Sequence, residues 1–387
     1  MKIEILDDDL SRRVYDVEKF ENSEEDIVYI DSSDKENSAV EILKAYKNGV
    51  KQVLFDASNQ SIQELLKEVD FKDVDFSMLL FSSGTTGKPV GAFKTKENLE
   101  IEVKGFMKII EQYQPKKVIA TVPFVHVYGI LTAIILPYLS GIDLFFKKHF
   151  LPHDLLESIE PNSFVVTTPL YIKSLLRLGE TKDLSDVLFA SSTAPLDEKS
   201  AKEFIEKFNT NLIQLFGSTE TGGIAYKEQN DTLWKALPNV KVSTNEKSLL
   251  KINSPFISEL LYEDGFKNTN KEVQSFDYVE FEGERFKIIG RDSQIFKVAG
   301  KRFSTLHVEE ILESMSSVKK AFVVVKYNEG ELKDETLEIY LESVKAISLK
   351  EINKILREKI GNIKFPIKLK VVEKIPTTAV GKKIIPL

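Results

Sequence analysis

The side chains best suited to bind a phosphate lie between two apolar runs, at residues 82–88, which read SSGTTGK. Two glycines let backbone N–H groups approach an anion closely, four hydroxyl groups can donate to phosphate oxygens, and Lys88 adds positive charge. The pattern is not a Walker A loop, because it lacks the four-residue gap between the glycines and the Ser or Thr after the lysine, and Pro89 prevents a helix from continuing. The segment therefore predicts a phosphate-binding loop, or alternatively a plain Ser/Gly hairpin turn.

Two further segments place unusual side chains directly after strand-like runs. Residues 216–223 read FGSTETGG, so the carboxylate of Glu220 stands among hydroxyls and glycines. Mg²⁺ takes one or two carboxylates together with phosphate oxygens and water, which makes Glu220 a candidate metal ligand, with a surface turn as the alternative. Residues 191–196 read SSTAPL, and small residues followed by proline would leave a flat slot for a planar ring.

A histidine and a lysine are weaker candidates when each is taken alone. His126 occurs in PFVHVYG, and a histidine among apolar neighbours is more often a hydrogen-bonded core residue than a site residue. Lys382 stands in PTTAVGKK, five residues before the end of the sequence, where a lysine is normally solvated. Neither residue would be selected without the segments described above.

Short apolar runs alternate with helical patterns along most of the chain, and these elements must position the candidate residues. Strands are predicted at residues 27–30, 50–55, 78–81, 117–121, 141–146, 163–169, 187–191 and 212–216. Helices are predicted at residues 39–48, 61–69, 96–112 with Thr95 as the N-cap, 129–139, 171–178 and 198–208. This alternation predicts an α/β protein with mixed or parallel sheets and ligand-binding loops at strand ends.

The pattern changes in the last third of the chain, which becomes strand-rich and charged. A Gly-Arg pair at residues 290–291, followed by a polar triplet, marks the predicted domain boundary. Beyond it, helices are predicted at 306–315 and 349–360, and strands at 319–326, 336–343 and 367–372. The sequence therefore predicts two domains, residues 1–290 and a compact α+β unit of residues 291–387.

Composition excludes several other kinds of protein and site. The 387 residues include no cysteine, which excludes disulfides and thiolate chemistry, and only four histidines, which argues against a multi-histidine metal site. No secretory signal is recognisable, and the longest apolar run, residues 129–139, is far shorter than the roughly 20 residues of a membrane span. We therefore expect a cytoplasmic protein without membrane insertion, and nothing indicates nucleic-acid binding.

Charge is distributed unevenly between the two predicted domains. Residues 291–387 contain 19 Lys and Arg against 13 Asp and Glu, a net charge of +6, which leaves −13 for residues 1–290. A basic small domain and an acidic large one suit a polyanionic substrate held between them. The alternative is an ordinary solvated surface.

Taken together, six segments resemble the acyl-activating superfamily of adenylate-forming, AMP-binding enzymes, which includes acyl- and aryl-CoA ligases, luciferases and the adenylation domains of peptide synthetases. They occur in the same order as in that family, from residue 78 onward: SSGTTGKPVG, PFVHVYG, SSTAPL, FGSTE, GRDSQIFKVAGKR and PTTAVGK. The resemblance implies a large N-terminal domain of mixed and parallel sheets with flanking helices, shortened at its N-terminus. It also implies a small, mobile C-terminal α+β domain, joined by a hinge near residues 291–293, which carries the catalytic lysine.

The resemblance implies a reaction in two steps. A carboxylate attacks the α-phosphorus of ATP to give an acyl-adenylate and pyrophosphate, and a thiol then converts the adenylate into a thioester and AMP. The cofactors would be ATP and Mg²⁺, and the thiol would be CoA or the phosphopantetheine of a carrier protein. The implied catalytic residues are Lys382, Thr219, Glu220 and His126, with Glu220 also the metal ligand. Lys382 would bridge the carboxylate and the α-phosphate, Thr219 would contact the α-phosphate, and His126 would lie at the mouth of the acyl pocket.

A larger set of binding residues follows from the same resemblance. The β- and γ-phosphates would be held by Ser82, Ser83, Gly84, Thr85, Thr86, Gly87 and Lys88. The adenine would be flanked by Ser192, Thr193, Ala194, Pro195 and Phe216, and Gly217 and Ser218 would also belong to the nucleotide-binding residues. The ribose would be bound by Asp277 and Arg291, with the triplet at residues 268–270 as an alternative to Asp277. The approach of the thiol would be lined by Lys297 and Gly300. The wall of the acyl pocket would be formed by Tyr128, Gly129, Thr168, Pro169 and residues 222–224.

Some positions depart from the pattern of the family. Val90 replaces the lysine usually found between the Pro and the Gly, and Ser293 stands where many relatives have Asp or Lys. These departures motivate the alternative of a catalytically weakened nucleotide-binding homologue. No acidic residue occurs at positions 123–129, where amino-acid-activating domains usually have an Asp, so an aryl or fatty acid is expected. The acceptor stays open between CoA and a separate acyl carrier protein, and a further alternative is an enzyme dedicated to such a carrier.

Overall fold

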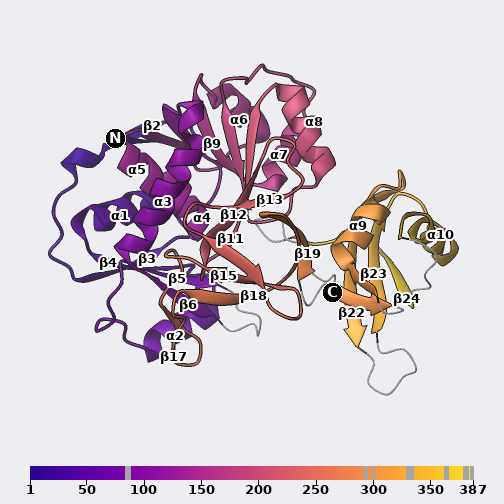
Figure 1. Cartoon of the computed structure of the whole chain (residues 1–387). Helices are drawn as coiled ribbons and strands as arrows, with labels where there is room; N and C mark the ends of the chain where they lie inside the picture. The colour runs from indigo at the N-terminus through magenta and orange to yellow at the C-terminus, as the bar shows by residue number, and fades with distance from the viewer. Residues whose placement is uncertain are drawn as a thin grey trace. The chain divides into compact units, whose positions relative to one another are not determined.

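The computed structural model describes residues 1–82, 89–291, 295–298, 301–327, 335–360, 366–377 and 383 (Figure 1). The chain divides into two compact units. The first comprises residues 1–242 and 251–273, and the second comprises residues 243–250 and 274–387. Residues 274–290 thus group with the second unit. The boundary predicted at residues 290–291 is the position of a hinge between domains, and that hinge stays a prediction.

The first unit contains a large sheet with a parallel centre. Six parallel strands lie in the order β11-β10-β9-β7-β8-β1, and β2 and β12 add antiparallel neighbours to β1 and β11. The bounds are β1 (Lys2–Leu6), β2 (Arg12–Asp16), β7 (Lys117–Ala120), β8 (Asp143–Lys147), β9 (Ser163–Thr167), β10 (Leu188–Ser191), β11 (Asn211–Ser218), β12 (Gly222–Glu228) and β13 (Trp234–Ala236), which pairs with β12. The predicted α/β class with mixed and parallel sheets is confirmed.

A second sheet of this unit carries the candidate phosphate loop. Its strands lie in the order β17-β16-β6-β5-β4-β3, of which β3, β4 and β5 are parallel and the rest antiparallel. The bounds are β3 (Ile27–Asp31), β4 (Lys51–Phe55), β5 (Met78–Ser82), β6 (Val90–Lys94), β16 (Leu260–Tyr262) and β17 (Phe266–Asn268). Strands β5 and β6 form a hairpin, and its paired end residues, Ser82 and Val90, precede and follow the candidate loop in the sequence.

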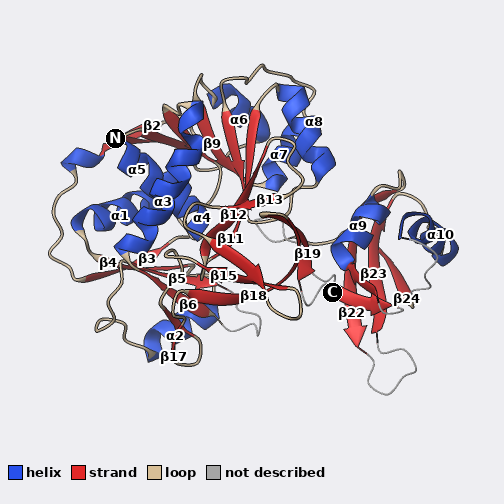
Figure 2. Cartoon of the chain, viewed as in Figure 1, coloured by secondary structure: helices blue, strands red, loops and turns tan. Residues whose placement is uncertain are grey.

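Helices connect the parallel strands and flank the sheets (Figure 2). Their bounds are η1 (Val17–Lys19), α1 (Lys35–Asn48), α2 (Gln60–Glu68), α3 (Lys96–Ile110), η2 (Glu111–Tyr113), α6 (Pro152–Ser158), α7 (Pro169–Leu176) and α8 (Glu198–Phe208). Helix α3 begins as predicted, because Thr95 and Asn98 form reciprocal side-chain to backbone hydrogen bonds of 3.0 and 3.1 Å. Helices α7 and α8 lie side by side (Figure 1).

The helix predicted at residues 129–139 is a buried helical segment with three parts. These are α4 (Val127–Ile130), a π-helical turn η3 (Leu131–Ile135) and α5 (Leu136–Ser140). Most of its residues are buried, as the continuous apolar run requires. No helix in the described parts of the chain is long and apolar enough to cross a membrane.

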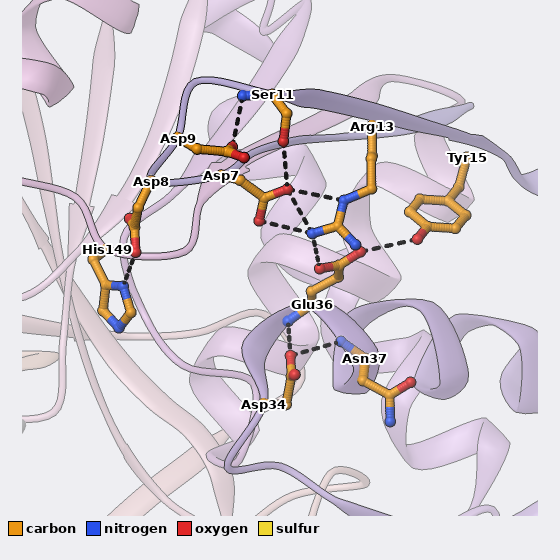
Figure 3. A network of polar contacts seen from close by, with 10 residues as sticks. All are labelled: Asp7, Asp8, Asp9, Ser11, Arg13, Tyr15, Asp34, Glu36, Asn37 and His149. Atoms are coloured by element: carbon orange, nitrogen blue, oxygen red, sulfur yellow. Dashed lines mark hydrogen bonds and ion pairs between the residues drawn. The ribbon is translucent and has the colours of Figure 1, made fainter.

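The N-terminal hairpin of β1 and β2 was not predicted from the sequence, and a polar network ties it to α1 (Figure 3). Arg13 on β2 pairs with Asp7 (Nη2 to Oδ2, 2.6 Å) and with the Glu36 carboxylate, to which the Tyr15 hydroxyl also donates at 2.9 Å. Asp34 accepts hydrogen bonds from the first N–H groups of α1. The network therefore fixes the start of α1 against the edge of the large sheet.

The second unit contains the α+β fold that the sequence predicts. Strands β22, β23 and β24 form a sheet with the core helices α9 and α10 beside it (Figure 1). The bounds are β20 (Ile295–Val298), β21 (Lys301–Ser304), α9 (Thr305–Glu313), β22 (Val318–Tyr327), β23 (Glu335–Ser343), α10 (Leu349–Ile360) and β24 (Ile367–Val372). Strands β14 (Lys241–Thr244), β15 (Leu249–Asn253), β18 (Glu272–Glu282) and β19 (Arg285–Arg291) neighbour one another in that order.

Candidate active site

The candidate phosphate loop connects two paired strands of the first unit. β5 ends at Ser82, β6 begins at Val90, and these two residues are opposite one another in the hairpin. Ser83, Gly84, Thr85, Thr86, Gly87 and Lys88 lie outside the described residues, so their phosphate contacts stay predictions. The hydroxyl of Ser82 donates a hydrogen bond to Oε1 of Glu220. The structure therefore brings the start of the loop to the candidate metal ligand, which lies 138 residues further along the chain.

Glu220 lies in the turn between the antiparallel strands β11 and β12, and glycines make this close turn possible. A Cβ on Gly217 would lie 2.3 Å from the carbonyl oxygen of Gly222. Gly222 itself has a φ of +70°, and a Cβ there would come within 2.2 Å of the Glu102 carboxylate. The glycines of FGSTETGG are thus required by the packing of the turn.

Hydroxyl groups on either side of Glu220 close the turn. Oγ1 of Thr221 accepts a hydrogen bond from the Ser218 N–H at 3.1 Å, and Oγ of Ser218 accepts one from the Thr221 N–H at 3.2 Å. Ser218, a predicted nucleotide contact, therefore has a structural role in the turn as well. Thr219, the predicted α-phosphate contact, is half-buried between Ser218 and Glu220. Its role stays a prediction.

Two buried charged side chains, which were not selected from the sequence, contact the same turn. Lys94 is 1% exposed, and its Nζ donates to the carbonyl oxygens of Glu220 (3.1 Å) and Phe256 (2.7 Å). Glu102 on α3 is 8% exposed, and its Oε1 accepts a hydrogen bond from the Gly223 N–H at 2.6 Å. Burial lowers the pKa of Lys94 to about 8 and raises the pKa of Glu102 to about 7, and the opposite charge of the other residue opposes each change.

A sequence signal for Glu102 existed in the helical spacing of α3. Leu99, Val103 and Phe106 define the buried face of the helix, and Glu102 falls on that same face. Lys94 has no comparable signal, since it is simply the last residue of an apolar strand.

The chemistry of this turn fits a magnesium ion. Among the described residues, no three His, Asp or Glu side chains cluster closely enough to hold a metal by themselves. One carboxylate beside a phosphate-binding loop is nevertheless the donor set that Mg²⁺ uses when phosphate oxygens and water complete its coordination. Glu220, with the Ser82 hydroxyl next to it, supplies such a set. Metal binding by Glu220 stays a prediction.

The two segments predicted to flank the adenine lie on neighbouring parallel strands: residues 192–195 follow β10, and Phe216 belongs to β11. Oγ of Ser192 donates to the Leu215 carbonyl oxygen at 2.9 Å and so ties residues 192–195 to the strand that carries Phe216. The Phe216 ring is tilted against Trp234, with 5.6 Å between ring centroids. Trp234 belongs to no motif and was not selected from the sequence, yet it supports the ring that would contact adenine.

The backbone after Ser192 is strained. Thr193 adopts a φ of +76°, a left-handed conformation that is uncommon for a β-branched residue. Ala194 next to it is half-buried, and Pro195 is exposed. Strain of this kind persists where the surrounding structure holds it, often at binding sites, so it supports the nucleotide role predicted for this segment.

His126 immediately precedes α4 and is exposed. The surrounding protein lowers the pKa of its ring by desolvation, and the charge of Asp56 opposes that change. Its exposure argues against the alternative of a core histidine. His126 therefore remains a candidate for the mouth of the acyl pocket.

The residues after His126 hold α4 against the sheet. The buried hydroxyl of Tyr128 lies 2.8 Å from the Ala190 carbonyl oxygen and 3.1 Å from that of Thr167, and burial raises its pKa. A Cβ on Gly129 would lie 2.5 Å from the Pro123 carbonyl oxygen, so only glycine fits there. The other predicted wall residues, Thr168, Pro169 and residues 222–224, lie at the start of α7 and of β12.

The predicted ribose contacts meet in the second unit. Asp277 on β18 is 6% exposed and stands opposite Arg291 on β19, whose Nε donates to Oδ1 of Asp277 at 3.2 Å. The alternative triplet at residues 268–270 lies in the first unit, where Thr269 donates to the Ser258 carbonyl oxygen at 2.7 Å. The structure thus brings together the two residues selected by spacing, and their ribose role stays a prediction.

Several remaining candidates are not placed by the structure. Residues 292–294, Gly300 and Lys382 lie outside the described residues, and Lys297 is described only through its backbone in β20. The neighbouring Lys383 is placed, with its Nζ donating to Glu309 (2.8 Å), Glu313 (2.7 Å) and the Ala321 carbonyl oxygen (2.7 Å). Lys383 therefore has a structural role, and Lys382 is the catalytic candidate of this Lys-Lys pair.

Known proteins resemble this chain over most of its length. A family model described as AMP-binding enzyme matches residues 7–248. The 2-succinylbenzoate–CoA ligase of Listeria monocytogenes is 24% identical over 351 residues, which are 82% of this chain and 72% of the relative. The 4-coumarate–CoA ligase of Cereibacter sphaeroides is 23% identical over 245 residues, 62% of this chain, and the match covers only 55% of that relative.

Solved structures share the fold. The o-succinylbenzoate CoA synthetase (MenE) from Bacillus subtilis, in complex with its acyl-adenylate intermediate, gives a TM-score of 0.78 at 16% identity, covering 92% of this chain and 86% of that chain. The same enzyme with ATP and a magnesium ion gives 0.77 at 15% identity, covering 98% of this chain and 94% of the other. At these identities the likeness shows the fold, with a large N-terminal and a small C-terminal domain.

Proposed function

The chain belongs to the AMP-binding enzyme family, and from this premise we propose that it activates a carboxylic acid with ATP and passes the acyl group to a thiol. The observation that carries the proposal is the contact between Ser82 and Glu220. It joins the first residue of the predicted phosphate-binding loop to the predicted magnesium ligand, across 138 residues of sequence.

The first half-reaction joins two anions. A carboxylate oxygen of the acid forms a bond to the α-phosphorus of ATP, and the bond from that phosphorus to the α,β-bridging oxygen breaks, so pyrophosphate leaves with the electron pair. The residues of the loop hold the β- and γ-phosphates, and Lys382 holds the two reacting groups together against their repulsion. Mg²⁺, when bound, supplies charge neutralisation of the phosphates.

The second half-reaction consumes the acyl-adenylate. The sulfur of the thiol forms a bond to the acyl carbon, the bond from that carbon to the phosphate oxygen of AMP breaks, and the thiol proton leaves to solvent. Lys297 and Gly300 line the path of the thiol. The sequence supports these roles, because the segments that carry Lys297, Gly300 and Lys382 occur in the same order as in the family.

The acid is an aryl or fatty acid. No acidic side chain lies in residues 123–129 to bind an ammonium group, and the exposed His126 stands at the start of α4. Two relatives are named for aromatic carboxylic acids, 2-succinylbenzoate and 4-coumarate, so aromatic acids are the first to test.

A pyrophosphate-release screen with ATP, Mg²⁺ and a panel of aryl and fatty acids tests the proposal, with hydroxylamine present to trap the acyl-adenylate. We expect release that depends on one class of acid and a hydroxamate that matches it. The proposal fails if folded protein gives no acid-dependent release. Adding CoA, or a carrier protein bearing phosphopantetheine, then identifies the acceptor by the thioester that forms.

One observation favours a second candidate, a nucleotide-binding homologue with weakened catalysis. Val90 is 7% exposed at the start of β6, where relatives with the family pattern have a lysine beside the phosphates. Such a protein would bind ATP or AMP in calorimetry without releasing pyrophosphate with any acid.

A further inference from the structure

Three polar residues that come after the predicted phosphate loop in the sequence are buried, one on β6 and two on α3. Lys94 ends β6, and Asn98 and Glu102 lie on the first turns of α3, so that each member comes four positions after the one before it. They are 1%, 4% and 8% exposed. Residues of these types are mostly exposed in proteins, so their burial in one row requires an explanation. We call Lys94, Asn98 and Glu102 the polar row.

Together, the members of the polar row bind main-chain atoms of two segments far away in sequence. Lys94 donates to the carbonyl oxygens of Glu220 and Phe256. Asn98 Nδ2 donates to the Pro255 carbonyl oxygen at 2.7 Å. Glu102 accepts the Gly223 N–H, as described above. The row therefore holds the turn that carries Glu220 and the segment at residues 255–256 to the same helix.

A bond between these two segments completes the arrangement. The Ser258 N–H donates to the Glu220 carbonyl oxygen at 3.0 Å, which is the same oxygen that accepts from Lys94. Two donors thus hold the main-chain carbonyl oxygen of Glu220, whereas the carboxylate of Glu220 accepts a hydrogen bond from Ser82.

The polar row does not have the composition that stability alone would favour. Well-packed apolar residues of similar volume stabilise a protein as well as buried charges do, or better, because burying a charge removes it from water. What buried polar side chains provide is a fixed geometry, since each hydrogen bond constrains both distance and direction. The geometry fixed here is that of Glu220 relative to β6, the strand that leaves the phosphate loop.

We propose that Lys94, Asn98 and Glu102 are positioning residues, which set the position of the Glu220 carboxylate relative to Ser82, the first residue of the predicted phosphate loop, so that a magnesium-bound nucleotide meets a preformed site. The proposal rests on the proposed function and adds to it residues that touch neither nucleotide nor metal. Removing a member of the row should weaken binding of MgATP through displacement of Glu220.

Two variants of Glu102 separate positioning from charge. Glu102→Gln and Glu102→Leu both remove the negative charge, but only Gln keeps an oxygen that accepts the Gly223 N–H. Measured by calorimetry, MgATP affinity should fall about tenfold or more in Glu102→Leu and stay within about threefold of the unmodified protein in Glu102→Gln, the range expected for supporting residues of a metal site. Circular dichroism and melting temperature establish that both variants are folded.

A double-mutant cycle tests whether the effect acts through Glu220. Lys94→Met should weaken MgATP binding in the unmodified protein but add little in a Glu220→Gln background, because the carboxylate to be positioned is already gone. Equal losses in both backgrounds would overturn the positioning role. Asn98→Ala enters the same cycle if Lys94→Met does not fold.

The outcomes for this inference and for the proposed function are distinct. If the unmodified protein binds no MgATP, the proposed function and the positioning role both fail. If it binds MgATP and releases pyrophosphate, but folded Glu102→Leu and Lys94→Met bind with unchanged affinity, only the positioning role fails. A lower melting temperature with unchanged affinity counts as that second outcome, because it shows a structural role alone.

Discussion

Two carboxylates lie at the turn between β11 and β12, and their surroundings give them different chemistry. Glu220 is half-buried and contacts the Ser82 hydroxyl. Glu102 is buried, accepts a backbone N–H from Gly223, and has a pKa raised to about 7. A desolvated carboxylate that already satisfies the main chain is a poor metal ligand, so the predicted magnesium role suits Glu220 better than Glu102.

Replacing Glu220 with Gln should therefore remove a ligand charge while keeping the shape of the side chain. We expect the Mg²⁺ concentration for half-maximal pyrophosphate release to rise roughly 10- to 100-fold or more, since even supporting residues of metal sites have effects of that size. Glu246→Gln, at an exposed position of a loop in the second unit, is the matched control and should leave the Mg²⁺ dependence unchanged. An unchanged dependence in Glu220→Gln would exclude this residue as the ligand.

Gly222 and Gly283 provide a matched pair for the packing of this turn. Both have left-handed backbones, with φ of +70° and +63°, but a Cβ would overlap the Glu102 carboxylate at Gly222 and meet nothing within 4 Å at Gly283. Gly283→Ala should thus destabilise by about 1 to 2 kcal/mol from backbone strain alone. Gly222→Ala should destabilise by about 1 to 3 kcal/mol more, because of the overlap.

Urea unfolding monitored by circular dichroism measures this difference. Gly222→Ala should also lose nucleotide affinity, because the overlap displaces the turn that carries Glu220. Equal destabilisation by the two variants would contradict the contact between Gly222 and Glu102.

Helix α1 joins the N-terminal elements to the candidate acyl-binding segment. Nζ of Lys35, its first residue, donates to the carbonyl oxygens of Ala120 (2.9 Å) and Lys147 (3.4 Å), the last residues of β7 and β8. It also lies 5.5 Å from the ring centroid of Phe124 in PFVHVYG and 5.1 Å from that of Phe146. The network of Figure 3 also holds this end of α1, through Asp34 and Glu36. These elements together fix the segment that leads to His126.

The lowered pKa of Lys35 predicts how the free energy of unfolding depends on pH. Burial lowers the pKa of Lys35 from 10.5 to about 7. Above pH 7 the folded protein has released this proton while the unfolded chain keeps it up to about pH 10.5, so the unfolded state binds more protons and the free energy of unfolding rises with pH. Relative to Lys35→Met, the unmodified protein should therefore gain stability from pH 7 to pH 9.5, by at most about 1.4 kcal/mol per pH unit.

Chemical denaturation of both proteins at several pH values measures this difference. Lys67→Met, at an exposed position on α2, controls for the loss of a lysine side chain. If the difference in unfolding free energy between the unmodified protein and Lys35→Met is the same at every pH, the lowered pKa of Lys35 is contradicted.

The elements that the sequence predicts well are those with strong local signals. The apolar strand before Ser82 and the helix capped by Thr95 follow from residue type and spacing, and both are confirmed. The hairpin of β1 and β2 was missed because each strand has only five residues and β2 is largely polar, with Arg13 in an ion-pair network. Lys94 and Glu102 were missed because sequence patterns place charged residues at the surface, and only tertiary packing shows that these two are buried.

The proposed chemistry is divided between the two compact units. The first unit contains Ser82, Glu220 and His126, and the second contains Asp277 and the segment that leads to Lys382. Under the proposed function, the groups predicted for adenylation are thus divided between the two units. A reaction that needs both units can be controlled by their relative position, which is the role that the predicted hinge would have.

Lys382→Ala separates the two half-reactions of such an enzyme. Adenylation requires a cation between the carboxylate and the α-phosphate, so acid-dependent pyrophosphate release should fall about 10²- to 10³-fold, the loss seen when a single charge-stabilising donor is removed. Conversion of a chemically supplied acyl-adenylate and CoA into thioester should remain within a few-fold, because that step involves the thiol path near Lys297 instead. Lys374→Ala, an exposed lysine eight residues earlier, controls for loss of charge in this segment. Equal loss of both half-reactions would show that Lys382 acts throughout the cycle, and unchanged adenylation would remove it from the active site.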